Sequence, residues 1–185
     1  MRPVIKWIDV MNLWVGRVTC LLLLPVMAAM VFEVVSREAF RIMATMGMDD
    51  VAREWGLGPT LWAYETTRMF AGAMFMLGAG YALMRGVHIR ADFLYRNFSV
   101  SMQGRVDLTL YLLFYFPGLL VFLWTSIDFA WGSLSSAERG MDTAWMPYLG
   151  PIKAVLPVGI VLLLIQGISE VLKCWYAATR GRWPQ

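Results

Sequence analysis

The chain has 185 residues, of which 59% are apolar and only 16% are charged, with a formal net charge of +3. Soluble domains carry roughly a quarter charged residues, so this composition excludes an ordinary soluble protein and predicts one embedded in lipid. The two cysteines, Cys20 and Cys174, form no C-x-x-C pair, which removes the usual signature of a redox dithiol or a zinc site.

Four stretches of the chain are long and apolar enough to cross a bilayer, whose hydrocarbon core takes about 20 residues of helix. They are residues 10–35, 60–84, 106–131 and 152–176. None of them alternates with a period of two, so helices rather than barrel strands are predicted. The sequence therefore predicts an all-α integral membrane protein with a single four-helix domain over residues 1–185.

The first span is predicted to stay in the mature protein as a transmembrane helix. Its apolar region is long, contains Arg17 and Glu33, and has no small-x-small cleavage site of the kind that ends a signal peptide. Pro25 in this span, Pro117 in the third and Pro157 in the fourth are expected to kink their helices.

The loop after the first span, residues 36–59, is longer than a simple turn. It is expected to begin as a continuation of the preceding helix. A short second helix is expected over residues 49–55, because two aspartates favour a helix start and the Gly56-Leu57-Gly58-Pro59 run ends one. The loop either docks a partner or caps the bundle, and the sequence leaves both roles open.

The second span gives way to a basic amphipathic segment, residues 85–99. At helical spacing, His88, Asp92, Arg96 and Ser99 lie on one polar stripe, and the first three are four residues apart, close enough to pair. Segments of this kind lie on a membrane surface or against a partner.

The distribution of Lys and Arg around the spans predicts the orientation of the chain. The side with both termini and the 85–105 loop carries nine: Arg2, Lys6, Arg85, Arg90, Arg96, Arg105, Lys173, Arg180 and Arg182. The other side carries five: Arg37, Arg41, Arg53, Arg139 and Lys153. Both termini and the 85–105 loop are therefore predicted to be cytoplasmic, and the 36–59 loop lies on the outer side.

Ionisable residues inside the spans are the first candidates for function, because a charge in lipid is costly. Four fall at a similar outer level: Glu33, Glu65, Arg68 and Asp128. Three fall at an inner level: Arg17, Asp107 and Glu170. Glu65 and Arg68, three residues apart, are expected to pair. Arg17 is expected to be neutralised by one of the two inner carboxylates, because an unpaired charge in lipid costs several kcal/mol.

Neither level of charges lies at the midplane of the spans, where transporter substrate sites commonly lie. The charges are therefore interpreted first as ion pairs that fix helix register, with contacts to a partner subunit or an ion pathway as the alternatives. Gly72, Gly78 and Gly80 in the second span are predicted to allow close helix packing.

The central segment, Gly86-Val87-His88-Ile89-Arg90-Ala91-Asp92-Phe93-Leu94-Tyr95, resembles the end of the second helix in the DctQ family. This family comprises the small membrane subunits of tripartite ATP-independent periplasmic (TRAP) transporters. The resemblance marks a motif of expected subunit or membrane-surface contacts: Gly86, His88, Arg90, Asp92, Tyr95 and Arg96. A second, looser resemblance runs into the last span, at Glu138, Pro151, Ile152, Lys153, Pro157, Gly159 and Gln166.

The resemblance implies a small permease subunit in the bacterial inner membrane, which is not an enzyme and has no cofactor or metal of its own. The implied partners are a large membrane subunit of the DctM family, which carries the substrate and sodium sites, and a periplasmic substrate-binding protein. Lipids complete the expected partners, and nucleic acid is not among them. The small subunit is implied to be a fixed scaffold in sodium-coupled uptake of organic acids. C4-dicarboxylates, sialic acids, keto acids and sugar acids all remain open as substrates.

Two other classes of membrane protein remain as alternatives. A membrane anchor subunit of an oxidoreductase complex usually supplies haem or quinone ligands, and the single histidine, His88, cannot provide bis-histidine haem ligation. A self-sufficient small homo-oligomeric transporter needs a substrate path of its own, and the charges of this chain lie at the wrong depth for one.

Reversing the motif charges by Arg90→Glu with Asp92→Arg is expected to reduce both assembly with the large subunit and uptake. Each new side chain would face a charge of its own sign in the pairs that the motif makes locally or with the partner. Co-purification and transport assays measure the two effects. Intact assembly and uptake would show that the motif does not act through charge pairing.

Overall fold

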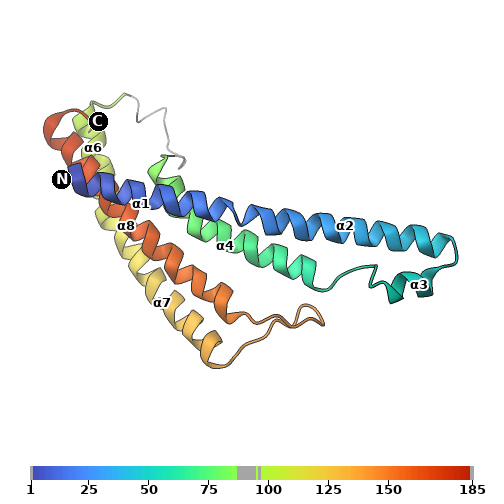
Figure 1. Ribbon diagram of the computed structural model, residues 1–185. Helices are drawn as coiled ribbons and strands as arrows, with labels where there is room; N and C mark the ends of the chain where they lie inside the picture. Colours follow the sequence, from blue (N-terminus) through green and yellow to red (C-terminus); the bar gives the residue numbers. More distant parts are fainter. Residues whose placement is uncertain (1, 87–94, 96, 184–185) are drawn as a thin grey trace.

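The computed structural model describes residues 2–86, 95 and 97–183. The described residues form these helices in chain order: α1 (Arg2–Cys20), α2 (Leu23–Thr45), α3 (Asp49–Glu54), α4 (Trp62–Met84), α6 (Val100–Leu110), the π-helix η1 (Tyr111–Tyr115), α7 (Phe116–Ser135) and α8 (Gly150–Arg180). Figure 1 shows both ends of the chain close together, beside α6, and α3 far from them. We call the region around the start of α1 and the end of α8 the terminal end, and the region of α3 and residues 136–149 the loop end.

Three helical stretches among the described residues are long and apolar enough to cross a membrane, namely Arg2–Thr45, Val100–Ser135 and Gly150–Arg180. They confirm an all-helical, multi-pass membrane protein. The other predicted span forms α4, a helix of 23 residues that is long enough to cross but falls outside this set. Its first two turns hold Glu65 and Arg68, so the count of four spans stays a prediction.

The expected distortion at Pro25 is a break in the helix. Leu21 and Leu22 separate α1 from α2, and their N–H groups bond to carbonyls only three residues back, on Val18 and Thr19, at 3.0 Å each. The proline ring clashes with the carbonyl four residues before it, which belongs to Leu21, and this clash interrupts the regular ladder. The apolar span therefore contains two helices in place of one kinked helix.

Pro117 has a different effect in the third span. The helix widens into η1 just before it, and the π-turn absorbs the misfit between the proline and the preceding carbonyls. Pro157 leaves α8 helical from Gly150 to Arg180, so the loss of one hydrogen bond is tolerated there.

The 36–59 loop is partly helical, as expected. Helix α2 continues to Thr45, and α3 covers Asp49–Glu54 with two aspartates in its first turn. The chain then folds back onto α2, where the Ser36 hydroxyl donates to the carbonyl of Gly58 and accepts from its N–H, both at 3.0 Å. The loop is thus fastened to the helix that precedes it.

Helix α8 is the centre of the bundle. It packs against α1, α4, α6 and α7, whereas α2 packs mainly on α4. Figure 1 shows the pair α2 and α4 diverging from the pair α7 and α8 toward the loop end. The elements are therefore joined most closely at the terminal end, around α8.

Glycines bring these helices together, but only one of the three predicted positions does so. A Cβ at Gly80 would overlap Asn12 Oδ1 of α1, so the prediction for Gly80 is confirmed. Gly72 and Gly78 face open space with no atom within 4 Å of a Cβ, so the predictions for them are wrong. Neither residue therefore makes a close backbone approach within the described part of the chain.

The remaining close approaches use glycines of other helices. A Cβ at Gly159 of α8 would lie 2.7 Å from the carbonyl oxygen of Met76 in α4. A Cβ at Gly104 of α6 would lie 2.6 Å from the backbone nitrogen of Ala178 in α8. Backbones therefore touch directly, which is how membrane helices gain packing energy without a hydrophobic driving force between them.

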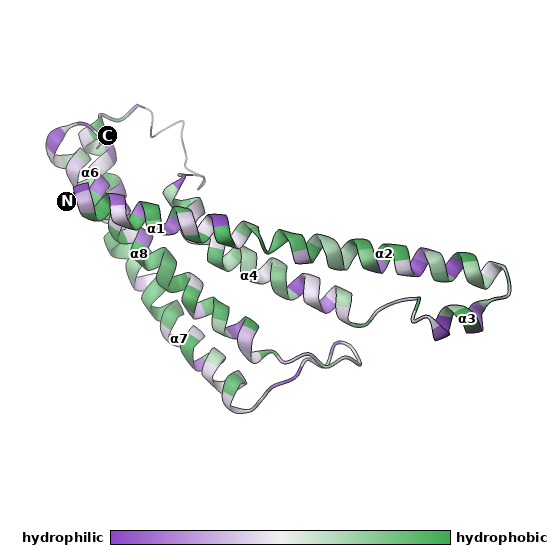
Figure 2. Ribbon diagram, viewed as in Figure 1, coloured by the Kyte–Doolittle hydropathy of each residue, from purple (hydrophilic) through white to green (hydrophobic). Residues whose placement is uncertain are grey.

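Large apolar side chains lie mostly on the outside of the bundle. Phe75, Trp124 and Trp131 are each more than 70% exposed. None of the most apolar part of Val100–Ser135 is buried inside the chain. Figure 2 shows apolar colour along the first part of α2 and along most of α7, and polar colour at α3 and near the N-terminus. This inverted distribution is expected where lipid or another membrane subunit covers the surface.

The Gly159→Ala substitution is expected to destabilise the protein by about 1–3 kcal/mol, because the new methyl group overlaps the Met76 carbonyl. The measurement is the thermal unfolding midpoint in mild detergent. Gly78→Ala is the matched control, since it adds the same methyl group to open space and should stabilise α4 by up to about 1 kcal/mol. Equal effects of the two substitutions would contradict the contact.

Candidate functional site

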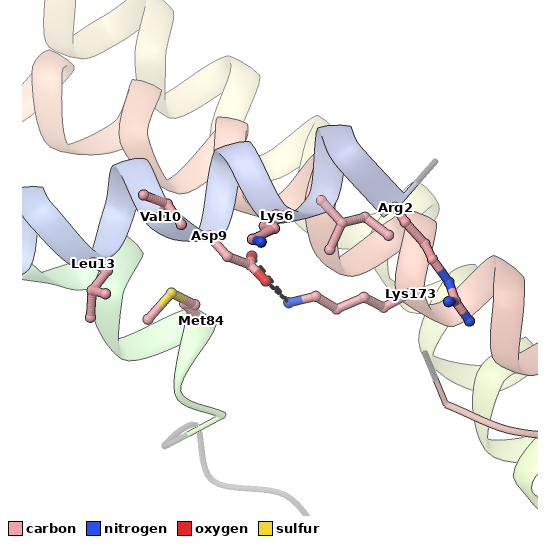
Figure 3. Close-up of a pocket in the computed structure, with 8 residues that line it drawn as sticks. Arg2, Lys6, Asp9, Val10, Leu13, Met84 and Lys173 are labelled. Carbon is pink, nitrogen blue, oxygen red and sulfur yellow. Dashed lines mark hydrogen bonds and ion pairs between the residues drawn. The ribbon is translucent and has the colours of Figure 1, made fainter. Parts of the chain in front are cut away.

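A partly buried polar cluster joins α1 to α8 near the terminal end. Lys173 of α8 donates to Asp9 of α1, with 2.9 Å between Nζ and Oδ2, and to Glu170 on its own helix at 2.8 Å. Figure 3 shows the Asp9–Lys173 pair, with Lys6 and Arg2 of α1 nearby. One ammonium group thus bonds two carboxylates from different helices.

Gln166 extends this cluster deeper into the bundle. Its amide nitrogen donates to Asp9 at 2.9 Å and to Glu170 at 3.0 Å, and its carbonyl oxygen accepts from Asn12 at 2.9 Å. The Ser169 hydroxyl also donates to Asp9, at 2.8 Å. Asn12, Gln166 and Ser169 are completely buried. We call these six residues, Asp9, Asn12, Gln166, Ser169, Glu170 and Lys173, the α1–α8 cluster.

Helical spacing places the cluster on two facing stripes. The four members on α8 lie at positions i, i+3, i+4 and i+7 from Gln166, and Asp9 and Asn12 on α1 are three residues apart. Hydrogen bonds between such stripes are strengthened by the low dielectric of the interior. They fix the rotation of α1 about its axis and its register along α8.

Helix α4 joins the cluster at Gly80. The space that a Cβ of Gly80 would fill is occupied by Asn12 Oδ1 and, at 3.3 Å, by the carbonyl oxygen of Leu162. Asn12 Oδ1 is buried and has no hydrogen-bond donor among the described residues. Three helices therefore meet at Asn12, with α4 supplying backbone rather than a side chain.

A pocket of about 490 Å³ lies beside the α1–α8 cluster. Its lining, drawn in Figure 3, consists of Arg2, Ile5, Lys6, Asp9, Val10, Leu13, Met84 and Lys173. The lining combines three basic side chains and one carboxylate with four apolar side chains.

At the loop end, Glu33 of α2 ties the start of α4 to α2. The carboxylate is only 8% exposed and accepts from the N–H of Thr60 at 3.0 Å, from the Thr60 hydroxyl and from Arg37. With the Ser36–Gly58 bonds, this anchor holds the chain before α4 against one face of α2.

Glu65 and Arg68 form the predicted ion pair within α4, at 2.8 Å. Arg68 also bonds Asp142 at 2.7 Å, which connects α4 to the 136–149 loop. Glu65 is only 1% exposed, and its second oxygen, Oε1, has no partner among the described residues. Asp128, predicted at the same level, lies exposed on α7 and forms no ion pair with a described residue.

The 136–149 loop is held to α8 by a further ion pair. Lys153 of α8 donates to Glu138 and lies 4.1 Å from the ring centroid of Phe129 in α7. The hydrogen bond from Lys153 lowers the pKa of the Glu138 carboxyl below its ordinary value. The pair therefore contributes to stability at neutral pH and is lost only as the pH falls through the lowered pKa.

The prediction that Asp107 or Glu170 neutralises Arg17 is wrong. Arg17 is exposed and lies over the ring of Trp14, 5.2 Å from its centroid, because its position on α1 faces away from α8. Glu170 is paired with Lys173, and Asp107 accepts from the Tyr95 hydroxyl at 2.6 Å. The three inner-level charges are therefore not brought together.

The DctQ-like motif is only partly within the described residues. Gly86 ends α4 with a positive φ of 66°, and Tyr95 bonds Asp107. His88, Arg90, Asp92 and Arg96 lie outside the described residues. The expected helical stripe does not continue through Ser99, which has an extended backbone and caps α6 by accepting from the N–H of Met102.

Sequence reasoning missed most of the α1–α8 cluster. Asp9 lies one residue before the predicted first span, so it does not appear as a charge inside a span. Lys173 lies near the end of the last span, where a basic residue indicates orientation. The signal was nevertheless present, because Gln166, Ser169 and Lys173 form a polar stripe in an otherwise apolar helix. Among the described residues, no group of His, Cys, Asp or Glu is arranged to hold a metal ion.

The family model described as tripartite ATP-independent periplasmic transporters, DctQ component, matches residues 26–176 of the chain. This match runs from the first turn of α2 to the last turns of α8. No curated protein and no solved structure matches the chain.

The Lys173→Met substitution is expected to destabilise the protein by about 1–3 kcal/mol, because it leaves the half-buried carboxylates of Asp9 and Glu170 without their cation. The thermal unfolding midpoint in detergent measures the effect. Lys6→Met is the matched control, since Lys6 is exposed on α1 and forms no ion pair with a described residue.

A double-mutant cycle separates the pair from general effects of the substitutions. Asp9→Asn removes one of the two carboxylates, so adding it to Lys173→Met should recover part of the lost stability. If the losses of stability from the two single substitutions simply add in the double variant, a direct interaction between Asp9 and Lys173 is contradicted.

Proposed function

Because the chain belongs to the DctQ family and is thus the small membrane subunit of a TRAP transporter, we propose that it is a non-catalytic scaffold for a large DctM-type subunit. In this proposal the transporter takes up an organic acid, delivered by a periplasmic binding protein, in symport with sodium. The substrate and sodium sites belong to the large subunit.

The observation that carries the scaffold proposal is that the buried charges are bonded within the chain. Glu33 binds Arg37 and Thr60, and the α1–α8 cluster contains its own cation. Pairs of this kind lie at the two ends of the bundle and join helices or loops to each other. A transport path needs polar groups that are free to exchange partners with substrate or ion, and these groups are engaged in holding the bundle.

The outer surface of the chain supports a large membrane partner. The apolar side chains of α2 and α7 face outward, and Trp124 and Trp131 present wide aromatic surfaces on α7. Tryptophan is enriched in the energetic centres of protein interfaces and at membrane boundaries. We propose that part of this surface packs against the large subunit and that lipid covers the rest.

We further propose four spans in the bacterial inner membrane, with both termini cytoplasmic and α3 in the periplasm. Termini that lie at one end of the bundle agree with an even number of crossings. The loop around α3 is fastened to α2 by Ser36 and Glu33, so it offers a fixed surface on the side where the binding protein would dock.

The experiment measures sodium-dependent uptake in proteoliposomes that contain the chain and its large subunit, with the binding protein added outside. A panel of C4-dicarboxylates, sialic acids, keto acids and sugar acids supplies the substrates. Uptake is expected to require all three proteins and a sodium gradient. The chain alone is expected to transport none of these acids.

The Glu65→Gln with Arg68→Gln variant tests whether the buried pair of α4 serves as scaffold or as ion path. Uptake is expected to fall only as far as the amount of assembled complex falls, with an unchanged sodium concentration for half-maximal rate. Arg53→Gln with Glu54→Gln, on the exposed side of α3, is the charge-matched control. A shifted sodium dependence in the first variant alone would overturn the scaffold proposal.

A further inference from the structure

The pocket beside the α1–α8 cluster has the layout of an amphiphile site. Its basic side chains, Arg2, Lys6 and Lys173, lie toward the chain termini, and its apolar lining continues to Leu13 and Met84. Arg2 and Leu13 are eleven residues apart on α1, about 16 Å along the helix axis. The pocket thus changes from charged to apolar over the distance between a lipid headgroup and the first part of its chains.

The charge of the pocket favours an anion. Lys173 is neutralised by Asp9 and Glu170, whereas Arg2 and Lys6 are exposed and pair with no carboxylate among the described residues. Asp9 is the only acidic residue in the lining, and its oxygens accept from Gln166, Ser169 and Lys173. The Arg2 side chain also bonds the hydroxyl of Tyr176, a neutral partner that leaves the charge of Arg2 uncompensated. Arg2 and Lys6 therefore give the pocket a positive charge that favours a phosphate group.

The size and shape of the pocket also suit a lipid. Its volume of about 490 Å³ lies within the range of small-molecule sites, about 300–1,000 Å³. Met84, the last residue of α4, forms one side of the pocket. Basic pockets between transmembrane helices are known to hold anionic lipid headgroups.

We propose that this pocket binds the phosphate headgroup of an anionic phospholipid through Arg2 and Lys6, with an acyl chain lying along Val10, Leu13 and Met84. The bound lipid fills the space between the first turns of α1 and the end of α4. The proposal requires that the chain spans a membrane and does not depend on the scaffold function or on the transported substrate.

The experiment titrates the chain, purified in mild detergent with the subunits that accompany it, with phosphatidylglycerol and with phosphatidylcholine of identical chains. Native mass spectrometry counts the bound lipids. Phosphatidylglycerol is expected to bind about tenfold more tightly, because each basic residue near the surface attracts an anionic lipid appreciably. Inorganic phosphate at millimolar concentration is expected not to displace it.

Two variants assign the binding to this pocket. Arg2→Gln with Lys6→Gln should abolish the roughly tenfold preference, whereas Arg53→Gln with Arg105→Gln, which removes the same charge from exposed positions on α3 and α6, should retain it. Met84→Trp should weaken the binding of both lipids to a similar degree, because the larger side chain fills the apolar part of the pocket without changing its charge.

Each of four outcomes would overturn the proposal. Equal affinity for the two lipids would remove the role of headgroup charge. Displacement by inorganic phosphate would assign the cations to a free anion. An equal loss of the phosphatidylglycerol preference in the two double variants would indicate a general effect of surface charge. Exclusion of lipid once the large subunit is bound would identify the pocket as part of a subunit interface.

Discussion

The bonding between α1 and α8 is the interaction on which the terminal end of the bundle depends. Lipid solvates Leu, Val and Phe as well as a protein interior does, so apolar side chains alone do not select one arrangement of helices. The α1–α8 cluster supplies the missing specificity, because Lys173 and Gln166 reach Asp9 only when both helices have one rotation and one register. Helix α4 then fits against Asn12 through Gly80, and the other helices follow α8.

Prolines and glycines shape what these bonds hold together. The break before Pro25 separates α1, which packs on both α4 and α8, from α2, which packs on α4. Close backbone contacts at Gly104 and Gly159 fasten α6 and α4 to α8. Toward the loop end the helices diverge, and ion pairs such as Arg68–Asp142 connect loops and helix ends there instead.

A protein built in this way is suited to stay still while a partner moves. Ion pairs and hydrogen bonds within the chain join helices and loops at both ends, and the wide apolar faces between them are left for lipid or for another subunit. This division agrees with a small TRAP transporter subunit that acts as a scaffold. The pocket at Arg2 and Lys6 differs from these regions, because its cations face outward beside an apolar surface.

The sequence by itself determined the class of the protein, its helical character, the family and the short-range pair Glu65–Arg68, because hydropathy, motif residues and helical spacing are local properties. It also located the distortions at Pro25 and Pro117. Only the tertiary structure decided which helices meet, and hence that Asp9 pairs with Lys173, that Arg17 turns to Trp14, and that Gly80 rather than Gly72 or Gly78 makes a close contact. Membrane helices are apolar on every side, so their sequences carry little record of which side faces a neighbour, and that choice depends on polar groups far apart in the chain.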